Sequence, residues 1–247
     1  MITKTRISTM AILGLVTSIV AVSTASKAVI GYRSGELHFA TALKDFEWAS
    51  YIGVIAVVLC LVGLWFSRPS SSRRGLFPSF LGLIVSLPLT VYIANFEYAA
   101  SVYPAINDIT TDMEEPPSFW EVPSPVVYPG SDVAELQRQS YPDIKPLTLA
   151  LDTAQVFKLA SVLARDMGWE IVSEDTDELQ IEAVATSLLF GFEDYVAVRL
   201  QDVNGLTRVD VRSHSRLGKI DRGVNAKRIE NYLRSLELRA SVLTVKN

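Results

Sequence analysis

The chain has 247 residues, 49% of them hydrophobic, and a formal net charge of −4. Residues 1–99 hold eight basic and four acidic residues, a net charge of +4, whereas residues 100–247 hold 15 basic and 23 acidic residues, a net charge of −8. An acidic C-terminal part excludes nucleic acid as its partner, because nucleic-acid interfaces carry an excess of basic side chains.

Three apolar stretches occupy residues 7–26, 48–66 and 76–96. Each approaches the ~20 residues that a helix needs to cross ~30 Å of hydrocarbon. We therefore expect an integral membrane protein whose residues 1–99 form three transmembrane helices, with the lipid bilayer as their partner.

Basic residues beside the apolar stretches predict the orientation. Lys4 and Arg6 precede the first stretch, and Arg68, Arg73 and Arg74 lie between the second and third. Because basic loops stay in the cytoplasm, we expect a cytoplasmic N-terminus and an exported C-terminal part, which in a bacterium means the inner membrane and the periplasm. The alternative is that the first stretch is a cleaved signal peptide, which leaves the C-terminal part on the same side.

Prolines mark the start of the exported part. Eight of the eleven prolines lie between Pro104 and Pro146, so residues 100–146 are expected to be extended and irregular. This arm is either a bare spacer or a segment packed on the domain that follows. We favour packing, because apolar residues such as Phe119 and Trp120 are untypical of a flexible linker.

Residues 147–247 show the periodicities of an α+β domain. Asp152 and Gln155 indicate the start of an amphipathic helix, and Gly168 its end. Strands are expected at residues 169–174, 179–186, 195–201 and 207–215, and a last helix at residues 225–239. The sequence therefore predicts a two-layer domain, an antiparallel sheet covered on one face by two helices.

Charged residues alternate along the last expected strand. The face of this strand that points away from the two helices carries the side chains of Arg208, Asp210, Arg212, His214 and Arg216. We call it the second face of the sheet. This face is either solvated, with charge pairs between neighbouring strands, or a cationic platform for an anionic or planar ligand. We favour the solvated face.

The most distinctive stretch is VRSHSRLGKIDRGVNAKRI, residues 211–229. Together with NDITTD, YPDIKPL and LFGFED earlier in the chain, it resembles a bacterial and plastid family, the domain of unknown function 1499. The likeness covers roughly residues 107–236, and His214 and Glu193 depart from the family pattern. The resemblance implies that the proline-rich arm belongs to the domain, and it implies no activity.

Basic residues crowd the expected start of the last helix, where the helix dipole already supplies positive charge. A cationic helix start with glycines nearby is typical of an anion site. The candidate residues are Arg212, Arg216, Lys219, Arg222, Asn225, Lys227 and Arg228, and Asn225 is also the expected N-cap. The alternative, which we favour, is that Asp194, Asp210 or the acidic residues 108–121 pair with them inside the protein.

Catalytic motifs are absent from the sequence, including GxSxG, HExxH, the P-loop and GxGxxG. The single cysteine, Cys60, lies in an apolar stretch, and the two histidines, His38 and His214, are far apart in the chain. We expect no metal, no cofactor and no catalytic residue. The sequence favours a binding or structural module of the cell envelope, whose partner would be an envelope protein or an anionic lipid headgroup. The alternative is an enzyme that holds an anionic substrate with residues 212–228.

Overall fold

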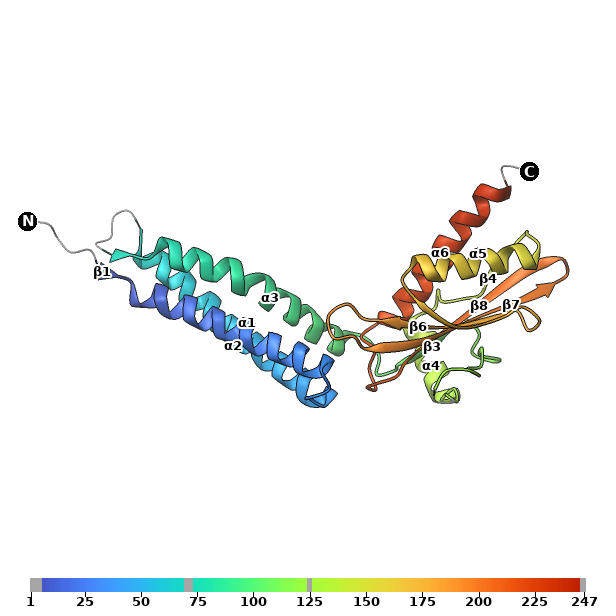
Figure 1. Cartoon of the computed structure of the whole chain (residues 1–247), viewed down its shortest axis with the longest axis horizontal. Helices are drawn as coiled ribbons and strands as arrows, with labels where there is room; N and C mark the ends of the chain where they lie inside the picture. Colours follow the sequence, from blue (N-terminus) through green and yellow to red (C-terminus); the bar gives the residue numbers. More distant parts are fainter. Residues whose placement is uncertain (1–5, 69–72, 124–125, 245–247) are drawn as a thin grey trace, which may run out of the picture. The chain divides into compact units, whose positions relative to one another are not determined.

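The chain forms two compact units in the computed structural model, Met1–Tyr98 and Ala99–Asn247 (Figure 1). The structure describes residues 6–68, 73–123 and 126–244. Lys4, which contributes to the predicted orientation, lies outside the described residues.

Three long helices build the first unit. They are α1 (Thr9–Arg33), α2 (Phe39–Phe66) and α3 (Leu76–Val102); the two-residue strands β1 (Arg6–Ile7) and β2 (Arg73–Arg74) precede α1 and α3 and pair in parallel. All three helices are long and apolar enough to cross a membrane. The three predicted apolar helices are therefore confirmed.

All three helices are longer than their apolar stretches. α1 continues through Lys27, and α2 already includes Asp45. Lys27 Nζ lies 3.3 Å from Asp45 Oδ2, so an ion pair joins the two extensions. The apolar pattern marks only the part that matches the hydrocarbon, whereas a helix continues as long as its backbone groups bond one another.

Small side chains form the contacts between the helices of the first unit. Along α1 the buried residues recur at spacings of three and four, the period of a coiled-coil seam. They are Ala11, Gly14, Ser18, Ala21, Ala25, Ala28 and Gly31. A Cβ placed on Gly14 would lie 2.7 Å from Cys60 Sγ, so glycine is needed for this close approach.

The second unit is built on an antiparallel sheet with the strand order β3-β8-β7-β6-β5, and β4 also pairs with β8. The strands are β3 (Asp108–Thr110), β4 (Leu147–Leu149), β5 (Glu170–Asp175), β6 (Gln180–Thr186), β7 (Glu193–Val203) and β8 (Leu206–Ser215). The four predicted strands are β5 to β8. The strands β3 and β4 were not predicted, because three residues are too few to show an alternating pattern.

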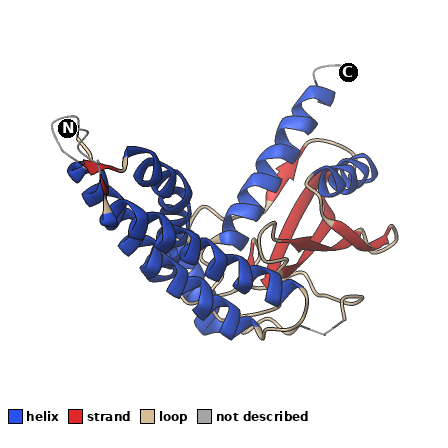
Figure 2. Ribbon diagram, turned by 60° about the vertical axis from the view of Figure 1, so that its left-hand side comes forward, coloured by secondary structure: helices blue, strands red, loops and turns tan. Residues whose placement is uncertain are grey.

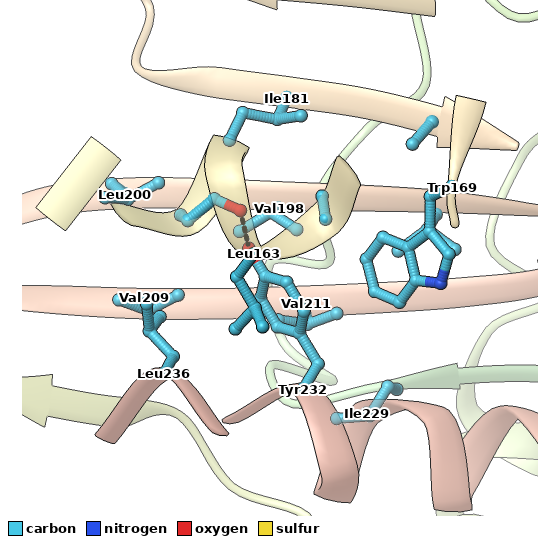
Figure 3. Close-up of a cluster of buried hydrophobic side chains, with 14 of the residues drawn as sticks. Leu163, Trp169, Ile181, Val198, Leu200, Val209, Val211, Ile229, Tyr232 and Leu236 are labelled. Carbon is cyan, nitrogen blue, oxygen red and sulfur yellow. Dashed lines mark hydrogen bonds between the residues drawn. The ribbon is translucent and has the colours of Figure 1, made fainter. Parts of the chain in front are cut away.

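On the first face of the sheet lie α5 (Thr153–Asp166) and α6 (Val224–Thr244) (Figures 1 and 2). Figure 3 shows Leu163 of α5 and Tyr232 of α6 among strand side chains such as Val198 and Val211. Tyr232 Oη donates a hydrogen bond to Ala160 O at 2.8 Å, which joins the two helices inside the core. The α+β class and the cover of one face by two helices are confirmed.

Residues of the arm cover part of the second face. Phe119 and Val122 are buried against Tyr195 and Ala197 of β7. The solvated face favoured from the sequence is therefore wrong for the residues below the arm. Strand alternation assigns side chains to a face, but it contains no information about a distant segment that covers that face.

The arm also contains a helix, α4 (Ser131–Ser140), which lies on the opposite side of the sheet from α5 (Figure 1). The expectation of an irregular arm is wrong here, because no proline interrupts the chain between Pro129 and Pro142. Gln137 of α4 accepts a hydrogen bond from Thr110 N at 3.0 Å and donates one to Thr110 O at 2.6 Å. These bonds satisfy backbone groups at the edge of the sheet.

Candidate functional site

The arm and the sheet meet at a buried ion pair. Arg212 on β8 donates from Nε to Asp108 Oδ1 at 2.9 Å and from Nη2 to Asp108 Oδ2 at 2.7 Å. The two side chains are only 2% and 0% exposed. Nη1 of Arg212 donates to Pro117 O at 3.1 Å, so the guanidinium is held by the arm on two sides. Such bidentate geometry is the strongest form of a charge-assisted hydrogen bond.

Neighbouring groups favour the ionised form of Asp108. Burial by itself raises the pKa of Asp108, but hydrogen bonds from Arg212 and His214 outweigh it and lower that pKa. The guanidinium also lies over the rings of Phe119 and Tyr128, with Cζ 4.9 Å and 5.4 Å from their centroids. Burial raises the pKa of Tyr128 to about 12, which keeps this phenol neutral.

A second cluster joins the last helix to the sheet. Arg228 of α6 donates to Asp194 Oδ2 of β7 at 2.6 Å and to Ser213 Oγ of β8 at 2.8 Å, and it also hydrogen-bonds Asn225. The side chains of Arg228 and Asp194 are 12% and 10% exposed. Asp194 is one of the internal carboxylates that the sequence suggested as partners of the basic residues.

The start of α6 differs from the prediction. Asn225 lies inside the helix, which begins at Val224, so its assignment as N-cap is wrong. Asp221, which precedes the turn, supplies the capping hydrogen bonds instead: its carboxylate accepts from the backbone N–H groups of Gly223 at 2.9 Å and Asn225 at 2.8 Å. Asn225 instead donates through Nδ2 to Asn107 O at 3.0 Å. Gly223 has φ +76°, which lets the chain turn into the helix, and this turn decides which residue reaches the free N–H groups.

The structure separates the seven candidate residues into two groups. Arg212, Asn225 and Arg228 belong to the two clusters below the surface. Arg216 pairs with Glu193 at the surface, and Lys219, Arg222 and Lys227 lie along the turn and first helical residues that follow. Lys227 Nζ lies 5.2 Å from the centroid of the Tyr103 ring.

A third cluster surrounds Asp210, which the sequence suggested as an internal partner of basic residues, but its partners are Arg199 and Arg208 and not the predicted candidates. This carboxylate is 0% exposed and lies 3.2 Å from Arg199 Nη2 and 3.0 Å from Arg208 Nε. Asp112 of the arm binds the same two arginines, at 3.2 and 2.8 Å. The signal in the sequence was the acidic arm itself, because its carboxylates need partners if the arm is packed.

Glu182 of β6 is a further buried carboxylate that holds the arm. It is 1% exposed and accepts from the backbone N–H groups of Trp120 at 2.7 Å, Glu121 at 3.1 Å and Val122 at 3.2 Å. Three successive amide donors around one carboxylate satisfy its charge without a cation. No local pattern could have predicted this, since the donors belong to the backbone.

These clusters explain what the arrangement does physically. Every buried side-chain nitrogen and oxygen of Asp108, Arg212, Asp194, Arg228 and Asn225 has a hydrogen-bond partner within the described part of the chain. The clusters thus attach the arm and the last helix to the sheet in one orientation, because buried charges tolerate little change in geometry.

Comparison with protein families matches residues 108–236 to the family described as Protein of unknown function (DUF1499). The match begins at Asp108 and includes all three clusters, together with β3 to β8. A search of curated proteins gives no match. Because the family match covers more than half of the 247 residues, the chain belongs to the DUF1499 family.

Proposed function

We propose that α1, α2 and α3 anchor the protein in the inner membrane of a bacterium, with the N-terminus in the cytoplasm and the second unit in the periplasm. Basic residues support this orientation. On the side assigned to the cytoplasm they are Lys4, Arg6, Arg68, Arg73 and Arg74, and on the other side they are Lys27, Arg33 and Lys44. Lys27 is also paired with Asp45.

Reporter fusions test the orientation. A reporter that is active only outside the cytoplasm is expected to work when fused after Asn247 and to be silent when fused after Arg74. Replacing Arg68, Arg73 and Arg74 with glutamine leaves two basic residues on that side against three on the other, and is expected to weaken the contrast. The opposite pattern of activity contradicts the proposed orientation.

Within this arrangement the arm, residues 100–146, and residues 147–247 act as one envelope module with a binding or structural role. The observation that carries the proposal is that Arg212 and Arg228 already bind the buried carboxylates of Asp108 and Asp194. Breaking such pairs to admit a ligand would leave buried carboxylates uncompensated, at a cost of about 3–5 kcal/mol. The module is therefore rigid, and recognition takes place at its surface.

Recognition of an anionic group is part of this proposal. Of the seven candidate residues, Lys219 and Lys227 are exposed at the surface, whereas Arg216, which is also exposed, already pairs with Glu193. These basic side chains and the positive N-terminal end of the α6 dipole would attract the same anion.

Inorganic phosphate added to the full chain in detergent tests this part. It is expected to raise the melting temperature of the second unit, less so in added inert salt. The variant Lys219→Gln with Lys227→Gln is expected to lose the gain. The matched control is Lys145→Gln with Lys158→Gln, two exposed lysines elsewhere on the unit. An equal rise in melting temperature with phosphate in both variants contradicts anion recognition at this site.

A further inference from the structure

One end of the second unit exposes large apolar side chains. In the loop between β6 and β7, Leu188 is 96% exposed and Leu189 37%, and after β8 Leu217 is 40% exposed. The two segments lie together, because Arg216 N donates to Glu193 O at 3.3 Å. We call Leu188, Leu189 and Leu217 the leucine edge. Exposed apolar side chains grouped at one place are typical of a surface that contacts a membrane or another protein.

Basic residues border the leucine edge. Lys219, Arg222 and Lys227 follow Leu217 within the turn and the first residues of α6. The carboxylates in these segments are engaged by the protein, since Glu193 pairs with Arg216, Asp194 with Arg228, and Asp221 accepts two backbone N–H groups. This border is therefore basic, although residues 100–247 as a whole carry a net charge of −8.

The chain enters the second unit at this same end. Tyr103 directly follows α3, which ends at Val102. Its ring packs at the start of α6, where a Cβ placed on Gly223 would lie 2.8 Å from the ring, and Lys227 Nζ lies 5.2 Å from its centroid. Tyr103, Gly223 and Lys227 all belong to the second unit. The end that carries leucines and basic residues is thus the end at which the chain enters this unit.

We infer that the leucine edge and the basic residues Lys219 and Lys227 dock onto the surface of the bilayer that the helices of this chain cross. The basic side chains bind the phosphates of anionic lipid headgroups, and the leucines enter the boundary between headgroups and acyl chains. Amphipathic surfaces bind membranes by this combination of apolar burial and attraction to anionic lipid. The inference rests on the proposed function, because it requires α3 to span the membrane and identifies the anionic group as a lipid headgroup.

Fluorescence quenching in vesicles containing the full chain tests the docking. The native cysteine, Cys60, is buried, so a label attaches to a cysteine introduced by Leu188→Cys, with unmodified protein as the blank. The matched control is Val203→Cys, 43% exposed, at the opposite end of the 11-residue strand β7 and so roughly 35 Å away. With nitroxides on the lipid headgroups, quenching is expected to be several times stronger at position 188 than at position 203. Equal quenching at both positions overturns the inference.

Lipid composition tests the role of the basic residues. In vesicles with anionic lipid, Lys219→Gln with Lys227→Gln is expected to reduce the quenching at position 188, and in purely zwitterionic vesicles the same change is expected to have little effect. Quenching that is the same in both kinds of vesicle, with and without the two changes, overturns the assignment to anionic headgroups. The nitroxide lipids are present in both leaflets, so quenching reports docking on whichever side of the vesicle the second unit lies. A failure to dock is therefore distinguishable from a reversed orientation, which the reporter fusions detect.

Discussion

The two faces of the sheet in the second unit are covered by different kinds of interaction. On one face α5 and α6 bury apolar side chains such as Leu163. On the other, the arm is held by buried carboxylates, including Asp108 with Arg212 and Glu182 with backbone N–H groups. Apolar burial is strong but non-directional, whereas buried charges require defined partners. We infer that the first face supplies most of the stability and that the second determines where the arm lies.

The largest loss of stability is expected when the buried ion pair on the second face, Asp108 with Arg212, is removed. Arg212→Met keeps the length of the side chain but leaves Asp108 buried without its cation, which is expected to cost about 3–5 kcal/mol of the free energy of unfolding. Hydrogen exchange of the full chain in detergent measures this loss, and amides of the arm are expected to lose protection first. Combining the change with Asp108→Leu is expected to restore much of the stability. A loss below about 1 kcal/mol would show that the pair does not hold the arm.

A comparable loss with a different pattern is expected on the first face. Leu163 is 2% exposed in the core, and Leu163→Ala removes buried methyl groups and leaves a cavity, which is expected to cost about 2–5 kcal/mol. The same exchange measurement is expected to show lower protection in all strands at once, because the core is shared. Loss confined to the arm would contradict the difference between the two faces.

Acid is expected to weaken the second face selectively. Asp108 has a lowered pKa in the folded protein, so its contribution to stability is present above the unfolded-state pKa of about 3.9 and is lost as the pH falls through the folded value. Protection of the arm amides is therefore expected to decrease below about pH 4. Asp108→Asn serves as the control and is expected to lack this part of the pH dependence. Unchanged protection of the arm at low pH would contradict the role of Asp108.

The smallest effect is expected at an exposed ion pair on the first face. Arg239 Nη1 lies 2.8 Å from Asp166 Oδ2, nearly the same separation as in the buried pair, but the side chains are 37% and 54% exposed. Water screens such pairs, so Arg239→Gln is expected to cost less than about 1 kcal/mol. A loss as large as that of Arg212→Met would mean that burial does not explain the difference.

The elements that sequence reasoning found share one property, a periodic pattern long enough to recognise. The three apolar helices, α5, α6 and β5 to β8 all have it, and Asp152 indeed accepts from Ala154 N and Gln155 N at the start of α5. The strand β3 has only three residues, and α4 lies within a proline-rich segment. Short elements are stabilised by their tertiary partners, and those partners are not visible locally.

The hydrogen-bond partners of the site residues could not be predicted either, because they lie far away in the sequence. Residues 211–229 were recognised as a cluster of basic side chains, but Asp108, which pairs with Arg212, is 104 positions earlier in the chain. The N-cap of α6 was misassigned to Asn225, because the turn at Gly223 brings Asp221 to the free N–H groups instead.

The sequence by itself determined the three membrane-length helices, the α+β class and the family, because length, periodicity and an extended motif are properties of neighbouring residues. Only the tertiary structure decided that the second face of the sheet is covered and that Arg212 and Arg228 bind internal carboxylates. It also decided that Leu188, Leu217 and Lys219 lie at the end of the unit where the chain leaves α3. These outcomes depend on contacts between distant segments, whose free energy is set by burial and hydrogen-bond geometry in the folded protein.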